Sequence, residues 1–203
     1  MRLSILLIPF LLFSCTHHEN KKKYLIDPLA KKLNDSALSL ATYSNEYEKA
    51  VYLLDQATEI DSNYFEAYKN KLSFLGLMPK VDIDKALVAI KNLSRLRPDD
   101  PEYIMLIGLF YLKKGDSTIA TNFLTNAANK YDKILDTMNR SSASYEFLLS
   151  YKAYNLILLG KEQEGHEIFK KLYSDTQDSL FKEYLIQTMN RTRQNILDSL
   201  PIQ

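Results

Sequence analysis

Apolar residues recur along most of the chain at the spacing of one face of an α-helix. In three segments an alanine is followed by a large apolar residue four positions later and by another apolar residue seven positions later. This i, i+4, i+7 pattern is typical of an amphipathic helix that buries one face. The alanines are Ala50, Ala86 and Ala120, and the third positions of the pattern are Ala57, Leu93 and Ala127.

A second helix is predicted before each of these segments, so the chain reads as a series of helix pairs. The three alanines are separated by 36 and 34 residues. Gly115 and Gly160 each follow a predicted first helix, where a glycine ends a helix in the left-handed conformation. Gly108 lies on the predicted first helix of the third pair and Ala120 on the second. Because Gly108 is small, the two helices are expected to approach closely at these residues. Helix pairs at such a period predict stacking around a continuous core.

The C-terminal third of the chain is less regular than the rest. From Ala120 to Gly165 is 45 residues, which exceeds the period by 11. Eleven residues are close to three helical turns, so longer helices could absorb them. Ser142 is expected near the connection between these longer helices. Residues 179–200 are predicted to form one long polar helix that caps the exposed end of the array.

These segments resemble the tetratricopeptide repeat (TPR) family, whose unit is a helix–turn–helix of about 34 residues. The resemblance covers roughly residues 30–175 and is strongest in the third unit. It implies an all-α, right-handed α-solenoid of three to four TPR-like repeats over 29–177, with a capping helix over 178–203. Another helical bundle with coincidental spacing is the alternative. The third unit carries Ile107-Gly108, Tyr111, Gly115-Asp116, Ala120, Leu124 and Ala127, and the second ends in Arg97-Pro98-Asp99-Asp100.

Members of the TPR family are mainly interaction modules, and the resemblance implies a concave groove that binds a polypeptide. An alternative is that apolar residues such as Leu109 are buried under the C-terminal helix. Asp35 and Ser39 stand where some relatives carry the Lys and Asn that bind a chaperone tail, so that role is not expected. By position, the groove residues are Lys69, Asn70, Ser73, Glu102, Met105, Leu109, Lys113, Tyr151 and Tyr154.

The N-terminal segment has a different pattern. Arg2 is followed by about 11 mostly apolar residues, which is typical of a signal peptide and too short for a membrane span. Leu12-Phe13-Ser14-Cys15 contains the only cysteine of the chain and resembles the bacterial lipobox. That resemblance implies a signal peptide over 1–14, lipidation of Cys15, and a polar tether over 15–28. A plain signal peptide that contains a cysteine is the alternative.

Composition narrows the possible functions. Lys plus Arg is 26 and Asp plus Glu is 25, so nucleic acid is not an expected partner. A single cysteine allows no internal disulfide and no thiolate metal cluster. His166 is the only histidine in the predicted folded region, and the chain has no HExxH, GxSxG or glycine-rich phosphate loop. We therefore expect neither enzyme activity nor a metal or cofactor.

The expected function is that of a non-catalytic, lipid-anchored adaptor in a bacterial cell envelope. The membrane partner would be the outer membrane, with the protein facing the periplasm, and the groove would bind another envelope protein or a peptide segment. The usage of Lys, Asn, Tyr and Ile suits a low-GC bacterium such as a member of the Bacteroidota. A periplasmic inhibitor or immunity-type lipoprotein that binds one specific enzyme is the alternative, and a hydrolase in an atypical helical fold is a third.

Overall fold

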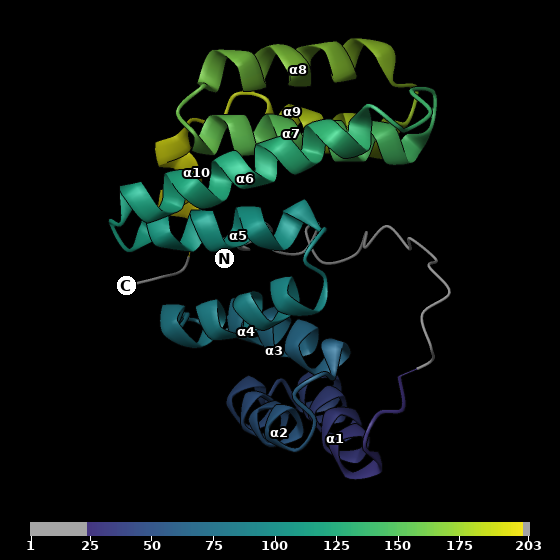
Figure 1. The fold of residues 1–203 in the computed structure, drawn as a ribbon, viewed down its shortest axis with the longest axis vertical. Helices are drawn as coiled ribbons and strands as arrows, with labels where there is room; N and C mark the ends of the chain where they lie inside the picture. Colours follow the sequence, from purple (N-terminus) through teal and green to yellow (C-terminus); the bar gives the residue numbers. More distant parts are fainter. Residues whose placement is uncertain (1–23, 201–203) are drawn as a thin grey trace. The chain divides into compact units, whose positions relative to one another are not determined.

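The protein is all-α over residues 24–200, which are the residues that the computed structural model describes (Figure 1). Ten helices and no strand lie in this range. The chain divides into two compact units, with the boundary between Arg97 and Pro98. The predicted signal peptide, Cys15 and most of the tether lie outside the described residues.

Unit 1 contains four helices that pack in the order of the sequence. Each helix contacts the next one, and α1 also contacts α3. Asp27 caps α1 by accepting hydrogen bonds from the backbone N–H groups of Leu29 and Ala30, at 2.8 and 3.2 Å. The helices are α1 (Pro28–Ser44), α2 (Tyr47–Ile60), α3 (Phe65–Leu77) and α4 (Ile83–Leu96).

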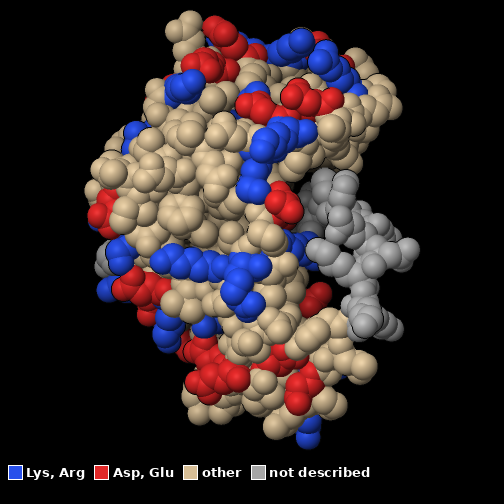
Figure 2. Space-filling view, in the orientation of Figure 1, with Lys and Arg blue, Asp and Glu red and all other residues tan. Residues whose placement is uncertain are grey.

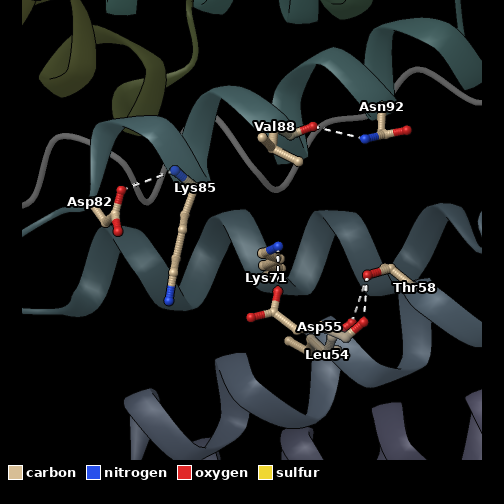
Figure 3. Close-up of polar contacts among 8 residues, drawn as sticks. All are labelled: Leu54, Asp55, Thr58, Lys71, Asp82, Lys85, Val88 and Asn92. Atoms are coloured by element: carbon tan, nitrogen blue, oxygen red, sulfur yellow. Dashed lines mark hydrogen bonds and ion pairs between the residues drawn. The ribbon is translucent and has the colours of Figure 1, made fainter.

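An ion pair between a buried lysine and a half-buried aspartate joins α2 to α3 in unit 1. The ammonium of Lys71 pairs with the carboxylate of Asp55, and only 7% of the Lys71 side chain is exposed (Figure 3). The Thr58 hydroxyl donates to the carbonyl groups of the preceding turn of α2. On α4, Asp82 accepts from the Lys85 backbone N–H at 3.0 Å and caps the helix. Lys71 and Thr58, the two buried polar residues named here, therefore each have a partner, as burial requires.

Unit 2 contains six helices, and the first four form two successive helix hairpins. Gly115 and Gly160 end the first helix of each hairpin with φ values of +86° and +83°, which an L side chain rarely adopts. α6 has 19 residues and takes up much of the extra length, after which Ser142 caps α7. The helices are α5 (Pro101–Lys113), α6 (Ser117–Leu135), α7 (Ala143–Leu158), α8 (Glu162–Asp175), α9 (Ser179–Thr188) and α10 (Arg193–Ser199).

Small residues mark the points where paired helices of unit 2 cross. A Cβ atom on Gly108 would lie 2.6 Å from Cγ of Leu124 and 3.2 Å from the carbonyl oxygen of Ala120. A Cβ atom on Gly165 would lie 2.6 Å from the carbonyl oxygen of Ala153. These contacts leave no room for a larger side chain. The alanines of the repeat pattern, Ala50, Ala57, Ala86, Ala120 and Ala127, are all fully buried.

The C-terminal segment forms two helices, so the prediction of one long capping helix is wrong. α9 ends at Thr188, and Thr192 begins α10 with a reciprocal capping box in which Asn195 is the partner. This cap satisfies backbone N–H groups at the start of α10, so the chain begins a new helix there and does not continue α9. No helix within residues 24–200 has the length and apolar character needed to cross a membrane.

Candidate interaction surface

The predicted groove in unit 2 is occupied by the C-terminal helices of the same chain. The ammonium of Lys113, at the end of α5, donates to the carbonyl of Leu197 in α10 at 2.9 Å. The ring of Phe147 in α7 lies 4.7 Å from the ring of Phe181 in α9, centroid to centroid. α9 and α10 therefore lie on the face of α5 and α7 that the TPR resemblance predicts as the partner-binding face.

Five of the predicted groove residues are buried in this arrangement. Met105 is fully buried and accepts a hydrogen bond from the Tyr131 hydroxyl at a sulfur–oxygen distance of 3.8 Å. Because buried side chains are not reachable by a partner, these residues belong to the core of unit 2 and not to an accessible groove. Leu109 is buried, as the alternative prediction requires, and the contact of Met105 is to Tyr131 of α6. The five are Glu102, Met105, Leu109, Tyr151 and Tyr154.

Two tyrosines, the buried Tyr154 of α7 and the half-buried Tyr184 of α9, lie at the contact between these helices. Burial raises the pKa of Tyr184 to about 12, with Ser150 and Arg191 acting in the opposite direction. Burial also raises the pKa of Tyr154, and Tyr184 adds to that shift. Both hydroxyls therefore stay neutral over the whole physiological pH range.

Three side chains of the helical hairpins hold the backbone of the C-terminal segment. Nε2 of His166 donates to the carbonyl of Arg191 at 2.9 Å, and Glu162 accepts from the backbone N–H of Arg193 at 2.9 Å. The contact from Lys113 to Leu197 is the third. His166 thus has a structural role. Sequence reasoning missed these contacts because each joins a side chain to a backbone group 25 or more positions away.

Of the four other predicted groove residues, Lys113 is half-buried on α5, and three lie on α3 of unit 1 and are reachable from solvent. Lys69, Asn70 and Ser73 are half-buried. The side-chain amide of Asn70 donates to the Asn34 side chain on α1 at 2.8 Å, which joins the two helices. On α1, Asp35 and other polar residues of the same helix are exposed. This polar surface of α1 and α3 is the accessible part of the predicted groove.

The charged side chains give this molecule no broad area of one sign on the face that Figure 2 shows. Lys and Arg side chains alternate there with Asp and Glu side chains. Nucleic acids are usually bound by clustered basic residues. Among residues 24–200, no group of three or more His, Cys, Asp or Glu side chains is arranged to hold a metal ion.

Comparisons with known proteins give no family assignment. No protein-family model matches the sequence. A search of curated proteins found no match either. The relation to the TPR family is therefore argued below from the geometry of the helix pairs.

Proposed function

We propose that the protein is a lipid-anchored, TPR-like interaction protein of a bacterial cell envelope, without catalytic activity. The observation that supports the TPR-like architecture best is a repeated crossing point in unit 2. Gly108 meets Ala120 in one hairpin, and Ala153 meets Gly165 in the next. Both members of the pair are shifted by the same 45 residues. An equal shift is what a structural repeat requires, because the helices of each copy must cross at the same positions.

Contacts between alternate helices also support stacked repeats. α1 contacts α3, and α5 contacts α7. In an α-solenoid the first helix of each repeat lies beside the first helix of the next one, and this row of helices forms the binding face. On this reading α1–α2, α3–α4, α5–α6 and α7–α8 are four repeats.

The partner surface that we propose is the polar surface of α1 and α3 in unit 1, around Lys69, Asn70 and Ser73. The corresponding face in unit 2 carries α9 and α10. A polar surface with half-buried side chains suits a partner that is bound through hydrogen bonds as well as apolar contacts. We propose that this partner is another envelope protein or a peptide segment of one.

The anchor is tested by fractionating cells that express the full chain with and without Cys15→Ala. We expect the unchanged protein in the membrane fraction after a carbonate wash and the variant in the soluble fraction. The reason is that several acyl chains bind a bilayer stably whereas a protein without them does not. Equal distribution of the two forms would overturn lipidation at Cys15.

The binding surface is tested by site-specific photo-crosslinking in the same cells. A photoreactive residue replaces Lys69 on α3, and the matched control replaces Lys170, which is exposed on α8. We expect one dominant crosslinked envelope protein from position 69 and none from position 170. The same product from both positions, or none from position 69, would place the partner surface elsewhere.

A further inference from the structure

The start of the described chain is fixed to unit 1 by one carboxylate. Asp61 follows the end of α2 and is 5% exposed. Its two oxygens accept hydrogen bonds from the Tyr24 hydroxyl at 2.5 Å and from the backbone N–H of Asp27 at 3.1 Å. The backbone N–H of Asn63 donates to the same carboxylate at 3.1 Å. We call this set of contacts the Asp61 junction.

Two further observations show that the Asp61 junction holds its position. Burial alone would raise the pKa of Asp61, but the hydrogen bonds from Tyr24, Asp27 and Asn63 outweigh that effect and lower it. The carboxylate is therefore charged at neutral pH, and charge-assisted hydrogen bonds are the stronger kind. The guanidinium of Arg95 binds the same loop through the Asn63 side chain and the Ser62 carbonyl.

Four residues that belong to this junction or lie close to it along the chain have exposed apolar side chains. Tyr24, Leu25 and Leu29 are 52%, 89% and 56% exposed, and Ile60, which directly precedes Asp61, is 44% exposed. Single exposed apolar residues are normal on a protein surface, whereas a group of them marks a contact site. Leu25 lies between two residues that the junction holds, so its exposure is a property of the fixed backbone. We call these four residues the tether-end patch.

Only a short stretch of sequence separates the predicted lipid anchor from the tether-end patch. Eight residues, 16–23, separate Cys15 from Tyr24. Even fully extended, this stretch spans at most about 30 Å. Its last three residues are Lys21, Lys22 and Lys23, and lysines next to a membrane are attracted to anionic headgroups. In Figure 1 the short purple segment before α1 leads directly into that helix.

We propose that the tether-end patch rests on the phospholipid bilayer that holds the lipid anchor. This inference depends on the proposed lipidation of Cys15. Leu25 and Leu29 enter the boundary between headgroups and acyl chains, and Tyr24 lies at the headgroup level. The Asp61 junction then fixes the orientation of unit 1 relative to the membrane, because it joins the patch rigidly to α2.

The test uses the lipidated full chain in vesicles of phosphatidylethanolamine and phosphatidylglycerol with brominated acyl chains. Leu25→Cys is labelled with bimane, whose fluorescence bromine quenches on contact. The matched control is Val88→Cys, an apolar site on α4 of unit 1 that is 53% exposed. Apolar groups at such a boundary lie about 5–10 Å into the bilayer, so we expect at least about threefold stronger quenching at position 25 than at position 88.

A second variant tests whether the patch itself causes the contact. With bimane at Ile60→Cys, the double substitution Leu25→Asp and Leu29→Asp should reduce quenching at position 60 to the level at position 88. Both leucines are exposed, so the substitutions leave the core intact. Unchanged quenching at position 60 would overturn the proposal.

The outcomes separate this inference from the proposed anchor. Vesicle-bound protein with equal quenching at positions 25 and 88 overturns the patch contact and leaves lipidation standing. Bimane at position 25 that is shielded from water but not quenched by bromine shows that a protein, such as a second copy, covers the patch, and this too overturns the contact. If the full chain isolated from cells carries no acyl chains and does not bind vesicles, both proposals are overturned.

Discussion

At the scale of the residue, Gly165 shows how closely two helices of unit 2 approach. A Cβ atom there would lie 2.6 Å from the Ala153 carbonyl oxygen and 2.7 Å from Cγ1 of Ile157. A carbonyl oxygen inside a helix cannot move away without disturbing its own hydrogen bonds. The glycine is therefore a packing requirement, in the position that alanine occupies in the preceding hairpin.

We expect Gly165→Ala to lower the free energy of unfolding by about 1–2 kcal/mol. Overpacking costs about 1–3 kcal/mol, and the higher helix propensity of alanine offsets up to about 1 kcal/mol of that. Urea unfolding followed by circular dichroism measures the change. Lys170→Ala, at an exposed position of the same helix, is the control and should change stability by less than about 0.5 kcal/mol. A stabilised Gly165→Ala protein would show that α7 and α8 lie further apart.

The sequence pattern predicts such small residues but not what surrounds them. Ala120 could be placed from the repeat spacing. Gly165 could be placed because its 11 extra residues are close to three helical turns and keep the same helix face buried. The roles of His166 and Glu162 could not, because the backbone groups they bind belong to a segment that the repeat pattern does not describe. A side-chain contact to a distant backbone leaves no periodic signal.

At the scale of the element, α9 is the helix whose role differs most from expectation. Phe181, Leu185 and Thr188 are buried and follow the same i, i+4, i+7 spacing as the repeat helices. This signal is present in the sequence, although the many polar residues around it suggest an exposed cap. The break before α10 also has a signal, since Thr192 and Asn195 have the spacing of a capping box.

We expect Phe181→Ala to destabilise unit 2 by about 3–5 kcal/mol, because it removes a buried ring that contacts Phe147. Thermal unfolding monitored by circular dichroism, together with hydrogen exchange of α7, measures the loss. Leu180→Ala is the matched control in the same helix, since Leu180 is 77% exposed. It should have an effect near zero. Similar effects of the two substitutions would show that α9 does not pack on α7 in solution.

At the scale of the whole molecule, the order of the helices follows closely from hydrophobic spacing, whereas the surface open to a partner does not. The family resemblance places Met105 and Leu109 on a binding face. α5, however, is apolar on all sides, and every residue from Pro101 to Phe110 is buried. A helix that is hydrophobic all round is expected in a core. Periodicity states that a face is buried, but it cannot state whether a partner or the chain's own α9 and α10 bury it.

The distribution of burial predicts a gradient of local stability in unit 2. In α10 only Ile196 is buried, and the helix has seven residues. Local opening free energies range from near zero for weakly packed ends to the global value for core helices. We therefore expect amides of α5 to exchange at least about 100-fold more slowly than those of α10 in hydrogen-exchange mass spectrometry.

The size of this difference decides whether the cover over α5 is part of one cooperative core. The contact from Lys113 to the Leu197 carbonyl is a hydrogen bond that joins α5 to α10. If α10 exchanges much faster than α5, this contact breaks and re-forms while α5 stays folded. Equal protection of the two helices would contradict the expected gradient, and it would mean that α10 unfolds only with unit 2 as a whole. Lys113→Met keeps much of the length of the side chain but removes its hydrogen-bond donor. If α10 opens separately, this substitution should speed amide exchange in α10 and leave exchange in α5 unchanged.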